Sequence, residues 1–180
     1  KECDWSSDVC SSDLEVRERQ LAAGEDSKRS QWRDEFTKEL TTVLPGSEIV
    51  GAKSSRLWNT VSALMPEADC RQRWVVKLDK LGFAVSTGSA CSSGKEAPSH
   101  VLSAMRLSPE QASRALRFSS GWETTRDDWQ QLLAALKQVQ AGMAKTYAAT
   151  LSHLISRNMM DEASDYLDTV RDKLPTTVAD

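Results

Sequence analysis

The sequence has no long apolar run, no strongly basic stretch and no paired cysteines, and each absence excludes a class of protein. No hydrophobic segment approaches the roughly 20 residues of a transmembrane helix. The first residues also lack the basic-then-apolar order of a secretory signal. A net charge of −3 provides no positive surface for nucleic acid or for an anionic membrane. We therefore expect a cytoplasmic chain with small-molecule or protein partners, and no nucleic-acid or membrane partner.

Cysteine is scarce, with four residues in 180. Cys3, Cys10, Cys70 and Cys91 show neither the C-x-x-C spacing of a zinc site nor the density of a disulfide scaffold, so we expect reduced thiols and no metal site. Cys70 falls in an amphipathic segment and is expected to be structural. Cys91 is different, because it lies among glycine and serine residues with little capacity to pack.

The N-terminal segment does not resemble a protein motif. Residues 4–14 read D-W-S-S-D-V-C-S-S-D-L, which resembles the translation of a sequencing-library adapter. We expect residues 1–14 to be non-native and disordered, and the alternative is a genuine flexible terminus rich in serine and aspartate. The remaining chain is expected to form one domain over residues 15–141, followed by a helical tail of unknown role over residues 142–180.

Helical and strand periodicities alternate along the rest of the chain. A helix with Ser27 as a possible N-cap is expected to end at Leu44-Pro45-Gly46. Thr125 with Asp128 forms an acidic capping box that opens a long helix. Further helices are expected over 70–81, from 98, from 108 and after 158, and strands over 48–50, 59–65, 83–86 and 116–119. The pattern predicts an α+β fold with a short sheet flanked by helices.

Two residues could carry chemistry. Cys91 could act as an exposed nucleophile on a flexible backbone, although an unreactive thiol in a loop is the simpler interpretation of spacing alone. Arg117 alternates with Leu116 and Phe118 in a strand, so its side chain should face the opposite side, with Ser119. A guanidinium there could bind a carboxylate bidentately, or it could pair with a surface acid. His100 and His153 are expected to be surface or packing residues.

Three groups of motifs resemble one enzyme family. Residues 85–102, V-S-T-G-S-A-C-S-S-G-K-E-A-P-S-H-V-L, resemble the active-site loop and following helix of NifS/IscS-type cysteine desulfurases. R-F-S-S-G with T-T at residues 117–125 and L-W-N-T-V at residues 57–61 resemble two further segments of that family, in the expected order. Together the resemblance covers roughly residues 27–139.

The resemblance implies a fold, a cofactor and roles for the two residues. The chain would be the small C-terminal domain of a fold type I, pyridoxal-phosphate-dependent transferase, which is a homodimer. Cys91 would be the nucleophile that carries a persulfide, and Arg117 would bind the carboxylate of L-cysteine. The sulfur would pass to an acceptor such as an iron–sulfur scaffold or a tRNA-thiolation protein.

The sequence also departs from the family pattern. Neither histidine is followed by lysine, so the Schiff-base lysine and the other cofactor-binding residues are expected to be missing, and the chain alone to be inactive. Arg106 stands where the family usually has glycine. The alternatives are a related class V aminotransferase or selenocysteine lyase, and a non-catalytic sulfur carrier or interaction module.

Overall fold

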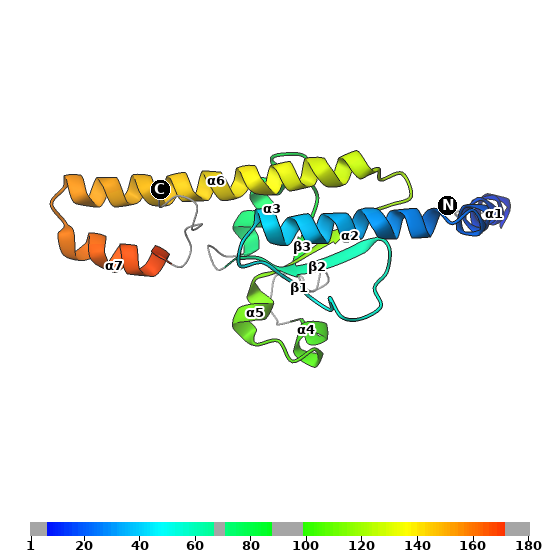
Figure 1. Cartoon of the computed structure of the whole chain (residues 1–180), viewed down its shortest axis with the longest axis horizontal. Coiled ribbons are helices and arrows are strands. Elements are labelled where there is room, and N and C mark those ends of the chain that lie inside the picture. Colours follow the sequence, from blue (N-terminus) through cyan, green and yellow to red (C-terminus); the bar gives the residue numbers. More distant parts are fainter. Residues whose placement is uncertain (1–6, 67–70, 88–98, 172–180) are drawn as a thin grey trace, which may run out of the picture.

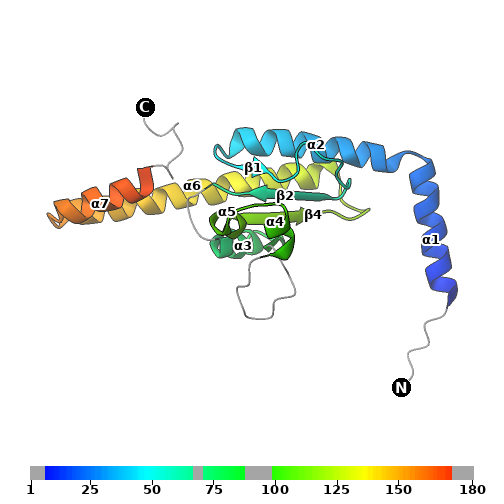
Figure 2. The ribbon, with the colours of Figure 1, turned by 90° about the horizontal axis from the view of Figure 1, so that it is seen from below.

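The computed structural model describes residues 7–66, 71–87 and 99–171. Two helices begin the chain, α1 (Ser7–Ala22) and α2 (Glu25–Val43), and they meet at a corner (Figure 2). The remaining elements are β1 (Glu48–Ile49), β2 (Thr60–Leu64), α3 (Arg71–Asp79), β3 (Ser86–Thr87), α4 (His100–Ala104), α5 (Pro109–Ser113), β4 (Ala115–Ser119), α6 (Arg126–Ser156) and α7 (Met160–Arg171). The fold is α+β, as the sequence predicts.

The four strands form one antiparallel sheet in the order β1-β2-β4-β3. The long pairing joins β2 to β4, where Val61 lies opposite Phe118 and Ser62 opposite Arg117. The short β3 pairs with the other edge of β4, so that Ser86 also lies opposite Arg117. Since β4 is flanked on both sides, Arg117 occupies the middle of the sheet.

The main hydrophobic core covers one face of this sheet. Helices α2 and α6 lie over that face (Figure 1). Phe118 from β4 packs edge-on against Phe36 of α2 with ring centroids 5.6 Å apart, and Phe36 in turn contacts Trp129 of α6 at 4.5 Å. The alternation of β-strand side chains sends Val61 and Leu116 to the same core. This face therefore carries most of the apolar burial.

A smaller cluster covers part of the opposite face, where α4 and α5 lie (Figure 1). Its buried members are Leu64, Leu102, Ala112 and Ala115. Val50 and Leu107 pack against it from the loops. The cluster covers only one end of the strands, and the residues that follow on the same face are polar. The Arg117 side of the sheet therefore has an apolar half and a polar half.

The C-terminal helices form an antiparallel hairpin that extends past the sheet (Figures 1 and 2). Helix α6 runs unbroken through residues 141 and 142, so the predicted boundary between domain and tail falls inside a helix. Met143 and Tyr147 of α6 and Val170 of α7 are buried in the main core. The tail is thus a continuation of the domain's longest helix.

Two expectations for the N-terminal region change. Residues 7–14 form the first turns of α1, so the disorder expected over residues 1–14 does not extend to them; their non-native origin stays a prediction. Ser27 is not an N-cap, because α2 already begins at Glu25. Gly24 takes that position with a φ of 74°, a conformation that glycine adopts without steric cost, and makes no side-chain cap.

None of the described helices is both long enough and apolar enough to cross a membrane.

Candidate functional site

Arg117 lies at the centre of the polar half of the sheet. It is half-buried between two buried neighbours, Leu116 and Phe118, whose side chains enter the main core on the other face. Its cross-strand partners are Ser62 on β2 and Ser86 on β3. Directly paired residues in an antiparallel sheet share a face, so a hydroxyl group flanks the arginine on each side. The orientation predicted from the alternation of the strand is the one observed.

Within the described part of the chain, no hydrogen bond or ion pair joins the guanidinium of Arg117 to another residue. The simplest expectation for an arginine, pairing with a surface acid, is therefore not met among these residues. A half-buried guanidinium between two serines presents donors in the planar geometry that a carboxylate accepts bidentately.

Cys91 lies outside the described residues, as do Cys3 and Cys70. The described chain stops at Thr87, the last residue of β3, and resumes at Ser99, which is buried and forms the N-cap of α4. These two residues flank the segment that contains the predicted nucleophile. Its role as nucleophile stays a prediction.

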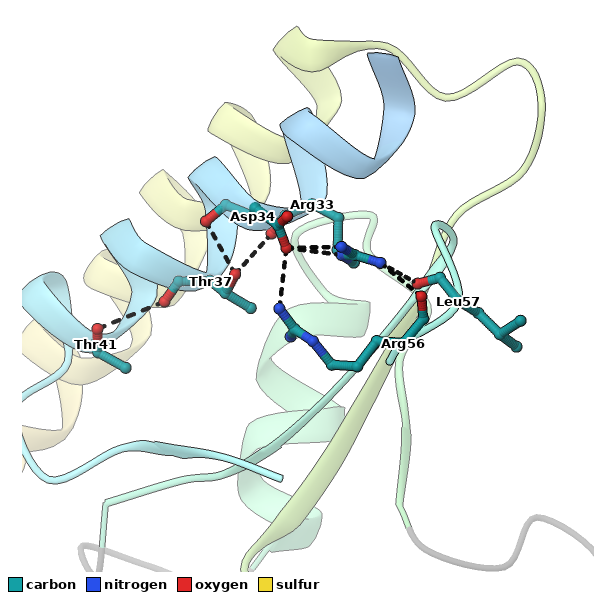
Figure 3. Close-up of polar contacts among 6 residues, drawn as sticks. All are labelled: Arg33, Asp34, Thr37, Thr41, Arg56 and Leu57. Carbon is teal, nitrogen blue, oxygen red and sulfur yellow. Dashed lines mark hydrogen bonds and ion pairs between the residues drawn. The ribbon is translucent and has the colours of Figure 1, made fainter. Parts of the chain in front are cut away.

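A buried arginine fixes the loop that leads into β2 (Figure 3). Arg33 of α2 is 7% exposed and donates to the backbone carbonyls of Arg56 at 2.9 Å and Leu57 at 2.7 Å. Asp34 accepts ion pairs from Arg33 at 2.8 Å and from Arg56 at 2.9 Å. The carbonyls and the carboxylate together solvate a charge that burial would otherwise penalise. The segment with the L-W-N-T motif is thereby held against α2.

A second arginine fixes the loop that follows β4. Arg29 of α2 donates to the carbonyl of Thr124 at 2.9 Å, and its guanidinium stacks over Trp122 at 5.3 Å and Trp58 at 5.7 Å. The two tryptophan rings are 4.7 Å apart. Cation–π contacts of this kind gain strength when the cation is shielded from water. The two loops that border β2 and β4 are therefore tied to each other and to the same helix.

Arg106 occupies a backbone conformation that favours glycine. Its φ is 63°, and the backbone N–H groups of Arg106 and Leu107 donate to the carbonyls of Ser103 and Leu102, respectively. This is the Schellman arrangement at the end of a helix, and it includes the usual apolar contact, here between Leu107 and Leu102. The resemblance noted in the sequence implies glycine at this position, and the φ of Arg106 is one that glycine adopts without steric cost.

A separate hollow lies on the core side of β4 and does not include Arg117. It has a volume of about 270 Å³, between the chain leading into β3 and the first turns of α6. Asp128 is one of its lining residues, and the pKa of Asp128 is lowered because the backbone N–H and the hydroxyl of Thr125 donate to its carboxylate, both at 2.8 Å. The lining residues are Gly82, Phe83, Ala84, Val85, Phe118, Ser119, Ser120, Thr124, Asp128, Trp129 and Leu132.

The other candidate residues do not gather into a site. His100 at the start of α4 and His153 near the end of α6 are both exposed. Across residues 7–66, 71–87 and 99–171, no three histidine, cysteine or acidic side chains lie close enough to hold a metal ion. The described chemistry is therefore limited to Arg117 and its serine neighbours.

Comparison with known proteins gives a consistent family. Over 110 residues the chain is 34% identical to the cysteine desulfurase IscS of Dictyoglomus turgidum, which corresponds to 61% of this chain and 28% of that protein. Over 98 residues it is 37% identical to a cysteine desulfurase of Rhodobacter capsulatus, 54% of this chain and 25% of the relative. More than half of this chain is thus similar to a part of each of these cysteine desulfurases. No protein-family model matches it.

The fold agrees with that relationship. A NifS-like protein from Rickettsia africae superposes with a TM-score of 0.54 at 24% identity, over 63% of this chain and 28% of that protein. The chain spans only 22–34% of the length of cysteine desulfurases similar to it, and 28–30% of the NifS-like proteins. The desulfurase resemblance that the sequence motifs carry is confirmed, and the fold class with it.

Sequence reasoning missed the contacts by which two arginines of α2 hold the loops next to β2 and β4. The charges of Arg29 and Arg33 gave no signal, because arginines on an amphipathic helix are most often solvated. The six tryptophans of the sequence were the available hint, because tryptophan side chains are mostly buried in packed contacts and seldom occur in such number on a polar surface. Only the folded chain shows that three of them, Trp32, Trp58 and Trp122, surround one guanidinium.

Proposed function

We propose that this chain is the small-domain part of a cysteine desulfurase, in which Arg117 binds the carboxylate of L-cysteine and Cys91 accepts its sulfur. The observation that carries the proposal is the half-buried guanidinium of Arg117, which lies between Ser62 and Ser86 without a protein partner among the described residues. The homology to cysteine desulfurases supplies the reaction.

The covalent chain keeps the proposed nucleophile within reach of the arginine. Ser86 lies opposite Arg117, and Cys91 follows it by five residues. Five residues span at most roughly 18 Å when fully extended. A substrate held by its carboxylate at Arg117 would therefore lie within the radius that the thiol can sample. In the proposed transfer, the bond between Cβ and the sulfur of L-cysteine breaks and that sulfur bonds to the Cys91 sulfur, which gives a persulfide. The electron pair of the broken bond stays on Cβ, where the cofactor of the parent enzyme would stabilise it, and Cβ takes the proton of the thiol to give L-alanine.

Pyridoxal phosphate, which the family implies, does not fit the residues around Arg117. No residue of the four strands is lysine, so the sheet offers no amine for a Schiff base. The described face offers a guanidinium and hydroxyl groups, which suit a carboxylate. We therefore assign substrate binding and sulfur transfer to this chain, and no cofactor step. The sulfur acceptor would be a protein such as an iron–sulfur scaffold.

Binding of the carboxylate can be tested on the chain itself by calorimetric titration. L-cysteine should bind and cysteine methyl ester, which lacks the carboxylate charge, should not. Arg117→Gln should abolish binding, whereas Arg126→Gln, at an exposed arginine paired with Glu35, should leave it unchanged. Equal binding of acid and ester would contradict the assignment.

The sulfur-transfer role needs the rest of an enzyme. The matching part of the Dictyoglomus turgidum enzyme would be replaced by this chain, and the release of alanine and the mass of Cys91 would be measured. We expect one added sulfur atom on Cys91, and its loss in Cys91→Ser together with sulfur delivery. Unchanged turnover and transfer in Cys91→Ser would refute the role of this thiol.

A sulfur carrier without catalysis is the second candidate, and the lysine-free sheet is the observation that favours it. A carrier would accept sulfur on Cys91 from a complete desulfurase, and it would not bind L-cysteine at Arg117. The titration above therefore separates the two candidates.

A further inference from the structure

The hollow on the core side of β4 has apolar walls. Phe83 and Val85, on the chain that leads into β3, are half-buried and pack against the main core. Phe118 of β4 and Trp129 and Leu132 of α6 are buried members of that core and also line the hollow. Its volume of about 270 Å³ is slightly below the range of roughly 300–1,000 Å³ that is usual for small-molecule sites. The hollow therefore suits a small ligand with an apolar body.

The backbone N–H groups beside the hollow already have acceptors. The N–H of Ser120 donates to the carbonyl of Asn59 at 2.9 Å. The N–H of Gly121 donates to the hydroxyl of Thr124 at 2.9 Å, and the N–H of Thr124 donates to the carbonyl of Gly121 at 3.3 Å. A ligand with a carboxylate or phosphate needs such donors. Because these N–H groups are engaged, this loop offers an anion no backbone cradle.

Asp128 alone carries a charge among the described residues that line the hollow. Its Oδ2 accepts hydrogen bonds from the backbone N–H and the hydroxyl of Thr125, both at 2.8 Å. Within the described part of the chain, its Oδ1 accepts no hydrogen bond and the carboxylate forms no ion pair. The two bonds from Thr125 hold the carboxylate in place and lower its pKa, so it is ionised at neutral pH. One oxygen of a fixed anion therefore remains for a cationic ligand.

The charges at this end of α6 also favour a cation. Arg126 is paired with Glu35 at 2.8 Å, so its charge is compensated. Asp127 adds a second acidic residue to the same first turn. The N-terminus of a helix carries the equivalent of only about half a positive charge, which the two carboxylates outweigh.

We propose that this hollow binds a small organic amine, with its apolar body between the chain leading into β3 and α6, and its ammonium group paired with Asp128. The rings of Phe83, Phe118 and Trp129 suit an aromatic body, because aromatic groups pack well edge to face. A neutral ligand would leave Asp128 without a counter-charge, and an anion would be repelled by it. The hollow lies on the opposite face of β4 from Arg117, so the proposal is independent of the proposed enzymatic role.

Calorimetric titration of the full chain at neutral pH with three molecules of similar size tests the charge preference. Phenethylamine should bind. Phenethyl alcohol should bind at least roughly tenfold more weakly, because a hydrogen bond between two charged groups is stronger than one from a neutral hydroxyl. Phenylacetate should not bind measurably, because its carboxylate meets that of Asp128.

Substitution of Asp128 tests the role of its charge. Asp128→Asn keeps a side-chain oxygen that can accept from Thr125, so the start of α6 is retained while the charge is removed. This variant should lower the affinity for phenethylamine to that for phenethyl alcohol, whose own affinity should not change. The matched control is Asp127→Asn, which removes an exposed charge outside the lining of the hollow. It should change the affinity by no more than roughly twofold, because water and salt screen that charge. Circular dichroism would verify that each variant is folded.

Nuclear magnetic resonance locates the bound amine. The backbone amide signals of residues 82–85, 118–120 and 128–132 should shift as phenethylamine is added, whereas those of α7 should not. Failure of the folded wild-type chain to bind phenethylamine would overturn the proposal. Equal affinity for amine and alcohol, stronger binding of phenylacetate, unchanged affinity in Asp128→Asn, or shifts confined to another part of the chain would each overturn it as well.

Discussion

The two faces of the sheet differ in what covers them. One face is closed by α2 and α6 around Phe36, Phe118 and Trp129, and the side chains in this core are almost fully buried. The other face has four buried residues at one end and, at the other, Arg117 between two serines. A single five-residue strand, β4, supplies both environments through the alternation of its side chains. The comparison shows that one strand can contribute to stability through the side chains on one face and to the proposed substrate binding through those on the other.

Truncating a side chain on the core face of β4 should have the largest effect on the free energy of unfolding. Phe118→Ala is expected to lower the free energy of unfolding by about 3–5 kcal/mol, because it removes a fully buried ring. Leu102→Ala, on the other face, should lower it by about 2 kcal/mol, because the smaller cluster can relax toward solvent. Urea unfolding followed by circular dichroism measures both. Equal losses would mean that the two faces contribute alike.

Helix starts provide the next comparison. Thr125 caps α6 on the core side and Ser108 caps α5 on the other, and each forms a complete capping box. Thr125→Ala should cost about 1 kcal/mol, because it leaves the N–H of Asp128 without its acceptor. Ser108→Ala should cost less in global unfolding, since α5 has only five residues and can open locally. Hydrogen exchange at the first turns would distinguish global from local loss.

Helices α3 and α4 both end in a residue with a positive φ, but the residue type at that position differs. Gly82 follows α3 with a φ of 85°, and Arg106 follows α4 with a φ of 63°. Arg106→Gly should therefore raise stability by about 0.5–1 kcal/mol, because it removes the steric cost of a side chain in this conformation. Gly82→Ala should lower stability by a similar amount, although open space surrounds the added Cβ. Thermal unfolding of the two variants should shift in opposite directions.

The smallest expected effect is on the pH dependence. Hydrogen bonds from Thr125 lower the pKa of Asp128 from its ordinary value of 3.8. A lowered pKa in the folded state stabilises the protein above the ordinary value, and this contribution is lost as the pH falls through the folded value. Asp128→Asn should weaken the pH dependence of the free energy of unfolding below about pH 4. A pH dependence identical to that of the wild type in this range would contradict this contribution.

Local signals in the sequence were sufficient for several elements. The capping box at Thr125, the stop at Leu44-Pro45-Gly46 and the alternation around Arg117 are all confirmed, because each depends on neighbours within a few residues. The strand expected over 83–86 is only the pair Ser86–Thr87. Its extent depends on its partner strand β4, whose paired residues lie 29 and 31 positions later in the chain, and local propensity does not contain that information.

The sequence by itself determined the resemblance to cysteine desulfurases, the α+β class and the face on which Arg117 lies, since motifs and side-chain periodicity are properties of short segments. Only the tertiary structure decided that Arg29 and Arg33 hold the loops around the sheet, that Arg106 takes a glycine conformation, and that the chain leading into β3 and the first turns of α6 border one hollow. These features depend on contacts between residues distant in sequence, and such contacts exist only once the chain has folded.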